Sequence, residues 1–370
     1  MNKIVVLKRC EDYDIDLIGI LIEDIYTRCD GPDPNGKTVL VKPNILTDND
    51  PARCISTHPV VVEAMVRYLM KRGARVLIGD SPAVHPGSFV GEKSGIKGVC
   101  ERTGAEWVAF TKNPATIQVA GKSLKIAAAS LEADLIISLP KFKTHELMYF
   151  TGAIKNTLGL VPGLNKAKQH ALHQDRVSFG KFLVDLNEAI TPHFFLMDGI
   201  MGMEGPGPGN GFPVKVGILA GSTNPVALDI IASGIAGYAH ADIPTTQVAL
   251  NKGLWLSSAD EIDYQGPELS SIIKEGFIRV GVRNNGNIAV QFVVRRIKPL
   301  RKLEHRPVFI RENCIGCGKC IAICPVKAIH LHPEKKNRVI LTDSKCIRCF
   351  CCSEVCPENA VEVRRKLFGQ

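Results

Sequence analysis

The sequence lacks a long apolar run. The longest charge-free window in the second half of its main body, residues 216–228, contains four polar or turn-forming residues and stops at Asp229, well short of the ~20 residues of a membrane-spanning helix. The first residues offer one apolar run, residues 4–7, before charge returns, and such a run is too short for the core of a signal peptide. We therefore expect a cytoplasmic protein with no membrane segment.

Aromatic residues are scarce, at 6% of the chain with only two Trp and six Tyr. Lys and Arg outnumber Asp and Glu by 46 to 37, a net charge of +9, and such a surplus raises the question of nucleic acid or an acidic partner. Because the positive charge is diffuse and few aromatic rings are available for base stacking, the sequence argues against nucleic-acid binding.

Two cofactor motifs are absent as well. The sequence contains no G-x-G-x-x-G dinucleotide fingerprint and no C-x3-C-x2-C triplet of the kind used in radical chemistry. Flavin mononucleotide needs no such fingerprint, so a flavin stays open as a cofactor.

Cysteine, in contrast, is concentrated in the C-terminal part. Nine of the 13 cysteines fall between Cys314 and Cys356, and in a cytosolic chain this density indicates metal rather than disulfides. The pattern C-x2-C-x2-C-x3-C-P begins at Cys314 and again at Cys346, a repeat of 32 residues. Each triplet can wrap three corners of an iron–sulfur cubane, while the fourth cysteine reaches the neighbouring cluster.

This repeat predicts two [4Fe–4S] clusters. We assign to one cluster Cys314, Cys317, Cys320 and Cys356, and to the other Cys346, Cys349, Cys352 and Cys324. A pair of zinc sites is the alternative, but zinc ribbons combine two C-x2-C units and need neither the third cysteine nor the C-P step. Cys351 lies out of frame beside Cys352 and is either a spare thiol or an alternative ligand.

Short β-prone runs flank the two cysteine loops and predict two hairpins related by a pseudo-twofold. The expected pairs are 308–310 with 328–331, and 339–341 with 361–363. The predicted domain limits are 1–297 for a larger domain, 298–306 for a basic linker and 307–370 for the cluster domain.

The larger domain alternates apolar runs with amphipathic helical stripes. The runs are typical of strands buried on both faces, and they lie at 4–7, 38–41, 75–78, 107–110, 135–139, 194–197 and 214–219. Helical spacing appears at 18–25, 61–68 and 179–190, the second after a Thr57 cap. This order predicts an α/β fold with a mostly parallel sheet and helices on both faces, followed by a small α+β ferredoxin-like domain.

Polar residues follow several of the predicted strands. In a parallel sheet the carboxyl ends of the strands share one rim, and ligands bind there. We therefore expect one crevice built by Lys42, Asn44, Asp80, Lys141, Lys143, His145, Asp198 and Glu204. Any one of these residues alone is more often a turn or a cap, but their joint occurrence at strand ends favours a site.

Two further segments have a functional and a structural interpretation. Residues 151–163 predict a helix whose small N-terminal residues admit an anion, with Lys155 and Asn156 one turn inside; a helix contact made by glycines is the alternative. The Gly/Pro-rich stretch 204–211 is either a mobile lid or a spacer. Three histidines, at 145, 170 and 173, are weak evidence for a metal site because no carboxylate accompanies them at fixed spacing.

Six short motifs occur in order along the larger domain: Val41-Lys42-Pro43-Asn44, Gly79-Asp80-Ser81-Pro82, Leu139-Pro140-Lys141-Phe142-Lys143-Thr144-His145, Ile154-Lys155-Asn156-Thr157-Leu158-Gly159, Asp198-Gly199-Ile200-Met201-Gly202-Met203-Glu204-Gly205-Pro206-Gly207 and Asn224-Pro225-Val226-Ala227-Leu228-Asp229. Together they resemble the domain of unknown function 362 family, whose members are often named uncharacterised iron–sulfur centre proteins. The resemblance covers roughly residues 1–290. It implies redox character and an attached two-cluster ferredoxin, and it implies no substrate.

A ferredoxin joined to a polar crevice predicts electron transfer to a bound small molecule. Our leading hypothesis is an iron–sulfur oxidoreductase that takes electrons from a redox partner protein and passes them to an anionic ligand or cofactor. The expected roles are anion binding by Lys42, Lys141 and Lys143, proton donation by His145, ligand or cation binding by Asp80, Asp198 or Glu204, and cofactor contacts by Asn44, Ser81, Lys155 and Asn156.

Two other hypotheses belong to different classes. In the first, the protein is a maturation factor whose crevice receives a metal or an apo-protein while the clusters supply reducing equivalents. In the second, it is a plain electron carrier whose larger domain only docks partner proteins.

Overall fold

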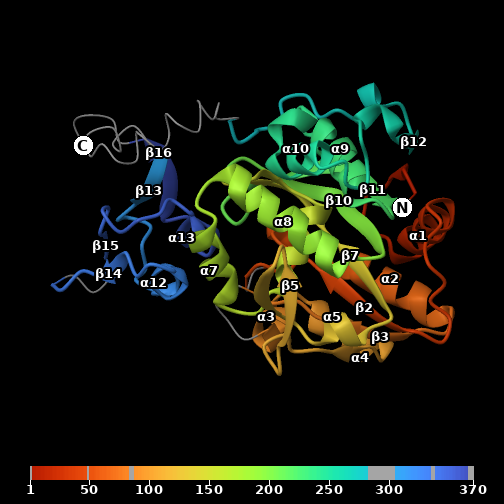
Figure 1. Ribbon diagram of the computed structural model, residues 1–370, viewed down its shortest axis with the longest axis horizontal. Helices are drawn as coiled ribbons and strands as arrows, with labels where there is room; N and C mark the ends of the chain where they lie inside the picture. The colour runs from red at the N-terminus through yellow and green to blue at the C-terminus, as the bar shows by residue number, and fades with distance from the viewer. Residues whose placement is uncertain (1, 48–49, 83–86, 282–304, 335–337, 366–370) are drawn as a thin grey trace.

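The computed structural model describes residues 2–47, 50–82, 87–281, 305–334 and 338–365. These residues form a large α/β body and a smaller C-terminal domain that lies beside it (Figure 1). Most of the linker that we predicted, residues 298–304, lies outside the described residues, as does the predicted end of the larger domain at 297.

One mixed sheet runs through the body in the strand order β12-β1-β11-β10-β7-β2-β3-β4. Its strands are β1 (Ile4–Arg9), β2 (Thr38–Pro43), β3 (Arg75–Ile78), β4 (Glu106–Trp107), β7 (Leu135–Leu139), β10 (Phe194–Glu204), β11 (Phe212–Ser222) and β12 (Asp263–Gln265). All neighbours along this order are parallel except β11, which runs antiparallel to β1 and β10. The prediction of a mostly parallel sheet is thereby confirmed.

Four further strands of the described body extend the sheet or stand apart from it. β8 (Lys141–His145) pairs in parallel with the second half of β10, and β9 (Tyr149–Thr151) pairs antiparallel with β8. A separate hairpin is formed by β5 (Ala115–Val119) and β6 (Lys122–Ile126).

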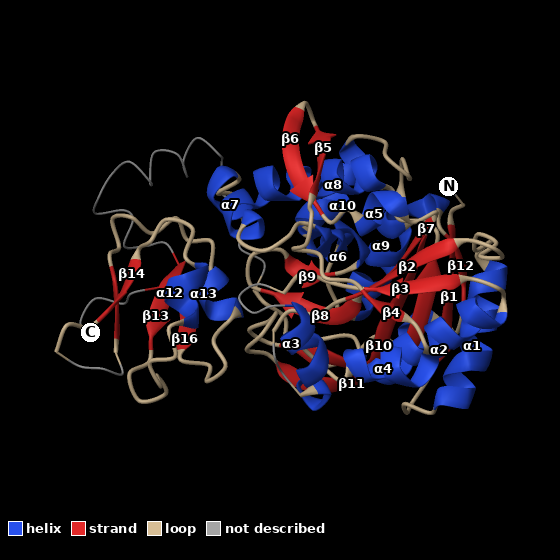
Figure 2. Cartoon of the chain, turned by 90° about the horizontal axis from the view of Figure 1, so that it is seen from below, coloured by secondary structure: helices blue, strands red, loops and turns tan. Residues whose placement is uncertain are grey.

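Helices cover both faces of the sheet (Figure 2). The helices of the body are α1 (Ile15–Arg28), α2 (Pro59–Lys71), α3 (Gly87–Lys93), α4 (Ile96–Thr103), α5 (Ala129–Glu132), α6 (Ala153–Asn156), α7 (Asn165–Leu172), α8 (Arg176–Ile190), α9 (Pro225–Ile235) and α10 (Pro244–Asn251). Short 3-10 helices are η1 (Pro51–Arg53), η2 (Thr157–Leu160), η3 (His240–Asp242), η4 (Ala259–Glu261) and η5 (Leu269–Ser271).

A large hydrophobic core lies on each face of the sheet. The strands contribute side chains to both cores because successive side chains point to opposite faces. In β1, Val5 and Leu7 belong to the core under α8 and α9, whereas Val6 belongs to the core under α1 and α2. Strands that are buried on both faces read as continuous apolar runs, which is why these runs were visible in the sequence. No helix within the described ranges is long and apolar enough to cross a bilayer.

The start of α2 differs from the prediction. His58, not Thr57, is the N-cap, and its side chain accepts a hydrogen bond from the Val60 amide. The Thr57 hydroxyl instead donates to the carbonyl of Leu139 at 2.6 Å and accepts from the amide of Asn44 at 2.8 Å. Thr57 therefore ties together the carboxyl ends of β2 and β7, where the candidate site lies.

In its described residues, 305–334 and 338–365, the C-terminal domain contains two small sheets and two short helices. Its elements are β13 (His305–Phe309), α12 (Lys319–Ile323), β14 (Ile329–Leu331), β15 (Val339–Leu341), α13 (Cys351–Glu354) and β16 (Val361–Arg365). β13 pairs with β16, and β14 pairs with β15. The predicted hairpins within each half are therefore wrong: the outer strands pair with each other and the inner strands pair with each other, so the two halves interlock.

Candidate functional site

A buried ion pair marks the carboxyl ends of β2 and β3. Lys42 Nζ lies 3.2 Å from Asp80 Oδ2, and both side chains are at most 2% exposed. The ammonium also donates to Asn156 Oδ1 at 3.0 Å and to the carbonyl of Pro43 at 2.7 Å. Burial lowers the pKa of Lys42, and the Asp80 carboxylate opposes this shift. Lys42 has three protein partners and is a fixed part of the framework.

Asn156 connects this pair to the next strand. Its Nδ2 donates to Ser138 Oγ at 2.9 Å, and its Oδ1 also accepts from Asn44 Nδ2 at 3.0 Å. Asp80 is held in turn by the amide of Ile45, which donates at 2.6 Å. The polar residues after β2 and β3 thus form one network with α6, as expected for neighbouring parallel strands.

Gly159 allows the chain to close over the ion pair. A Cβ on Gly159 would collide with the side chains of Lys42 and Asp80, so only glycine fits there. Just beyond, Ser81 Oγ accepts from the amide of Gly163 at 2.9 Å, and the Lys166 ammonium donates to the Ser81 carbonyl.

The N-terminus of α6 is occupied by a residue of the chain itself. Asp229 accepts from the amides of Ala153 at 2.6 Å and Ile154 at 3.1 Å. Burial raises the pKa of Asp229 to about 7, although these two hydrogen bonds act in the opposite direction. The anion that we expected at this helix end is therefore supplied internally, and Lys155 turns to the cavity described next.

A cavity of about 70 Å³ lies between the body and the C-terminal domain. The body contributes Lys42, Asn44, Asp80, Lys155, Asn156, Lys166 and His170, and the C-terminal domain contributes Ile323, Cys351, Glu354 and Val355. Burial lowers the pKa of Lys155 and lowers that of Lys166 to about 8. The cavity wall therefore carries cationic groups from the body and a cysteine loop from the other domain.

Three buried polar atoms of residues on this wall have no hydrogen-bond partner among the described residues: Asn44 Oδ1, His170 Nδ1 and Glu354 Oε1. His170 is 3% exposed and stacks on Phe179 with 4.2 Å between ring centroids. Burial lowers the pKa of His170 to about 4, so its imidazole is neutral at physiological pH. Unsatisfied buried polar atoms are costly, and their presence beside a cavity points to a bound polar ligand.

His145 contacts the C-terminal domain instead of the cavity. Its Nε2 lies 3.2 Å from Glu354 Oε1, although neither atom makes a hydrogen bond of good angle. Its Nδ1 accepts from the amides of Leu147 and Met148 at 3.0 and 3.3 Å. Burial lowers the pKa of His145 to about 3. Burial alone would raise the pKa of Glu354, but His145, Lys155 and His170 outweigh it and keep that pKa low.

A second buried polar group lies apart from the cavity. Lys141 and Asp198 face each other on β8 and β10, with 2.7 Å between Nζ and Oδ2 and no exposed side-chain surface. Tyr13 accepts from Lys141 at 3.0 Å and donates to Asp198 at 3.1 Å, and its ring stacks on His58. These groups satisfy one another, and none lines the cavity.

The remaining predicted residues have structural partners. Lys143 donates to the carbonyl of Ile55 at 2.6 Å, and burial lowers its pKa well below the usual value. Glu204 accepts from the amide of Ile278 at 2.9 Å. The predicted crevice is therefore divided: Lys42, Asn44 and Asp80 line the cavity, whereas Lys141, Lys143, His145, Asp198 and Glu204 lie outside it. Lys155 and Asn156, which were predicted on a separate helix, also line the cavity, and Ser81 is adjacent to it.

The Gly/Pro-rich stretch packs against the C-terminal domain. Asn210 Nδ2 donates to Ser353 Oγ at 3.1 Å and to the carbonyl of Val361 at 3.3 Å. A Cβ on Gly209 would collide with the carbonyl of Glu354. This stretch is a contact between the domains and not a free lid.

The C-terminal cysteines gather in two groups. Burial raises the pKa of Cys320 to about 12, and the negative charges of the neighbouring thiolates add to this shift. These neighbours are Cys317, Cys356 and Cys314. Cys352 is surrounded by Cys349, Cys346, Cys320 and Cys324. No three His, Cys, Asp or Glu side chains in the described ranges are close enough to hold a single metal ion. The spacing of the cysteines is that of cubane ligands and not that of a zinc ribbon.

Each repeat also directs a backbone amide at its fourth cysteine. Ala328 donates to Cys324 Sγ and Ala360 donates to Cys356 Sγ, both at 3.2 Å. Such hydrogen bonds to sulfur tune the potential of a cluster, and their equivalence reflects the pseudo-twofold of the sequence repeat.

Cys351 is a residue whose role the repeat did not predict. Its buried side chain packs with Ala167, Ile323 and Val355 at the domain contact, next to Cys349. It also lines the cavity. Lys166 and Glu354 also line the cavity and were not singled out, and His170 was considered only as a metal ligand. The spacing of Lys166 and His170, four residues apart on α7, was the available signal.

Comparison with known proteins agrees with this architecture. A model described as "Domain of unknown function (DUF362)" matches residues 39–234, and a 4Fe-4S dicluster domain matches residues 313–360. A thylakoid-associated protein of Synechocystis sp. is 36% identical over 227 residues, which are 61% of this chain and 71% of that protein.

Two solved structures are distant likenesses. The lactate racemase apoprotein of Thermoanaerobacterium thermosaccharolyticum has a TM-score of 0.42 at 15% identity over 62% of this chain and 57% of that one. A Thermotoga maritima protein has a TM-score of 0.33 at 14% identity over 54% and 52%. The matches thus span little more than half of those two structures, and they carry no functional argument. Because the first family model covers more than half of the chain, the protein belongs to the DUF362 family and carries a 4Fe-4S dicluster domain behind it.

Proposed function

We propose that the protein passes single electrons through two [4Fe–4S] clusters to a small anionic molecule bound in the cavity between the domains. One observation carries this proposal: the cavity has lysines of the body on one wall and Cys351 and Glu354, from the second cysteine loop, on the other. A ligand held there lies next to a loop that is expected to hold a cluster. Short distance between a redox centre and its acceptor is what electron transfer requires.

The two cysteine groups supply the ligands in this proposal. Cys314, Cys317, Cys320 and Cys356 hold one cluster, and Cys346, Cys349, Cys352 and Cys324 hold the other. The clusters supply one-electron transfer at low potential. Cys351 lines the cavity and packs beside Cys349, a ligand of the second group, so the cluster of that group is the one that serves the bound molecule.

The polar atoms of the cavity define the kind of ligand. Lys155 and Lys166 attract a negative group, Asn44 Oδ1 accepts a hydrogen bond from a ligand hydroxyl or amine, and His170 Nδ1 meets a further polar atom. The cavity of about 70 Å³ is small, which favours a compact ligand such as an oxyanion or a short carboxylate. The proposal does not use a flavin.

Lys166 supplies the proton that accompanies reduction. Its ammonium lines the cavity and has a pKa lowered to about 8 by burial, which matches a proton donor working near neutral pH. His145, which we expected in this role, does not reach the cavity and instead positions Glu354 on its wall.

The test uses the anaerobically reconstituted full chain. After reduction with dithionite and removal of the excess, the protein is mixed with a panel of small oxyanions and carboxylates while cluster reoxidation is followed by electron paramagnetic resonance. We expect one class of anion to reoxidise the clusters, and a Lys155→Met variant to lose this reaction while retaining its iron. The matched control is Lys71→Met, an exposed lysine at the end of α2. Equal reoxidation rates in all three proteins would overturn the proposal.

A further inference from the structure

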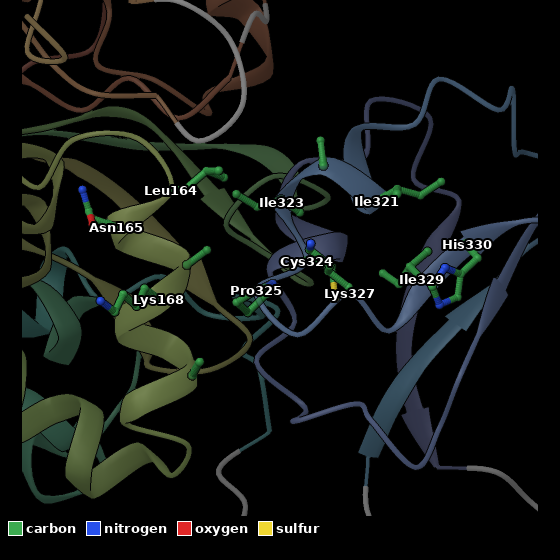
Figure 3. Close-up of a pocket in the computed structure, with 13 residues that line it drawn as sticks. Leu164, Asn165, Lys168, Ile321, Ile323, Cys324, Pro325, Lys327, Ile329 and His330 are labelled. Carbon is green, nitrogen blue, oxygen red and sulfur yellow. The ribbon is translucent and has the colours of Figure 1, made fainter.

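A groove of about 650 Å³ separates α7 of the body from α12 of the C-terminal domain. Figure 3 shows Leu164 on the α7 side close to Ile323, with Cys324 and Pro325 farther along the other side, and Lys168 is a lining residue of α7. Leu164, Lys168 and Ala171 follow the spacing of one helix face. Leu164 is 65% exposed, so this face of α7 has no apolar cover within the described part of the chain.

The groove reaches a proposed cluster ligand. Cys324 lies among its lining residues, and this cysteine is assigned to the cluster that borders the cavity. Ala167 and Ile323 line both the groove and the cavity, and both side chains are buried in their mutual contact. The groove and the cavity therefore lie on opposite sides of one thin wall, with the second cysteine group next to both.

The groove has an apolar floor and a cationic rim. Leu164, Ile321 and Pro325 provide the floor, and Lys168 and Lys327 provide exposed positive charge. Its lining includes no Asp or Glu. Protein interfaces combine an apolar centre with a polar rim, and this rim complements a negatively charged surface.

We propose that this groove docks an acidic, low-potential one-electron carrier protein that reduces the cluster held in part by Cys324. One electron leaves the reduced centre of the carrier, which becomes oxidised, and enters the cluster, which becomes reduced by one electron. A second copy of the chain is a poor occupant because its net charge of +9 would meet the same cationic rim.

A rival entry point lies near the first cysteine group. There a hollow of about 350 Å³ is lined by Cys314, Arg311, His332 and Arg338. It is also cationic, but it lies beside the cluster that is farther from the cavity. The test therefore includes both surfaces.

The probe is a dithionite-reduced, gel-filtered plant-type [2Fe–2S] ferredoxin, an acidic carrier with a potential of about −400 mV. Stopped-flow absorbance measures the rate at which it reduces the reconstituted full chain, and biolayer interferometry measures binding of the oxidised pair. We expect the double variant Lys168→Glu/Lys327→Glu to reduce the second-order rate and the affinity about tenfold at low salt, with the difference shrinking as salt is raised. Reduction by dithionite itself should not change.

Two further variants complete the test. Leu164→Asp places a charge on the exposed apolar floor and should also weaken carrier binding, whereas Lys71→Glu on α2 should change neither rate nor affinity. The proposal is overturned if the double variant reacts with the carrier as fast as the wild type does. It is also overturned if Arg338→Glu, a substitution in the rival hollow, is the only variant that slows the reaction. Because only cluster reduction and binding are measured, this result is independent of whether the cavity binds an anion.

Discussion

The Nε2 of His145 lies 3.2 Å from the Oε1 of Glu354, so the end of β8 in the body meets α13 in the C-terminal domain. The Glu354 carboxylate stands between this contact and the cavity. The two domains therefore share a polar wall, and the position of the cluster loop depends on residues of the body.

We expect Glu354→Gln to loosen this domain contact. The variant removes the negative charge that faces His145 and Lys155, and the loss of such a buried partner costs about 1–3 kcal/mol. Cleavage between the domains in limited proteolysis should become faster, while the iron content stays the same because no cysteine changes. Glu358→Gln, on the exposed surface of the same loop, is the control. If Glu354→Gln resisted proteolysis as well as the wild type, this contact would not be what holds the two domains together.

Replacing Gly159 with alanine should damage the cavity. The added Cβ would collide with Lys42 and Asp80, and overpacking of this kind costs about 1–3 kcal/mol. Urea unfolding monitored by tryptophan fluorescence measures the loss. Gly19→Ala in α1 is the matched control, because nothing lies within 4 Å of that position, and a helical glycine replaced by alanine gains up to about 1 kcal/mol. If Gly159→Ala unfolded at or above the wild-type midpoint, the tight approach at Gly159 would be refuted.

The buried histidines should make the body less stable in mild acid. The pKa of His170 is about 4 in the folded protein, below the value of about 6.5 in an unfolded chain. Its contribution to stability is therefore complete above pH ~6.5 and is lost as pH falls toward 4. At pH 5 the loss is about 2 kcal/mol for this one residue.

The variant His170→Gln isolates this effect from Asp229, whose raised pKa acts with the opposite sign. Urea midpoints at pH 7 and pH 5 should differ less in the variant than in the wild type, with cluster absorbance recorded to confirm that both proteins stay loaded. An equal pH dependence of the two proteins would contradict a neutral, buried His170.

Lys155 should raise the potential of the cluster next to the cavity. One positive charge at a distance of about 10 Å in a medium of effective dielectric constant about 20 is worth roughly 70 mV. In a redox titration followed by electron paramagnetic resonance, Lys155→Met should lower one of the two cluster potentials by about this amount and leave the other unchanged. Lys71→Met provides the control. If each cluster had the same potential in the wild type and in Lys155→Met, the charge of Lys155 would lie too far from either cluster to shift its potential.

The elements of the body could be predicted because local patterns specify them. Strands buried on both faces give apolar runs, and Lys42, Asn44 and Asp80 follow neighbouring parallel strands, so their meeting at one rim was predictable. The separation of Lys141 and Asp198 from that rim was not, because it depends on β8 pairing with β10 after β7 has ended. These two residues then neutralise each other away from the cavity.

The contribution of the C-terminal domain to the cavity also escaped prediction. Glu354 and Cys351 lie within a cysteine repeat, where the spacing of the ligands dominates the sequence signal. Their contact with Lys155 and Ala167 is set by domain packing, which local periodicity does not encode. The strand pairing of β13 with β16 failed for the same reason, since it joins the two ends of the repeat.

The most direct test of the central claim is mass spectrometry of the small molecules that acid precipitation releases from anaerobically purified protein, with iron and sulfide assayed on the same sample. The account predicts about eight irons per chain in the wild type and in Lys155→Met, with a small anion released in stoichiometric amount from the wild type alone. Eight irons with no released anion in either protein, or equal release from both, would contradict a cluster-linked anion site at the domain contact.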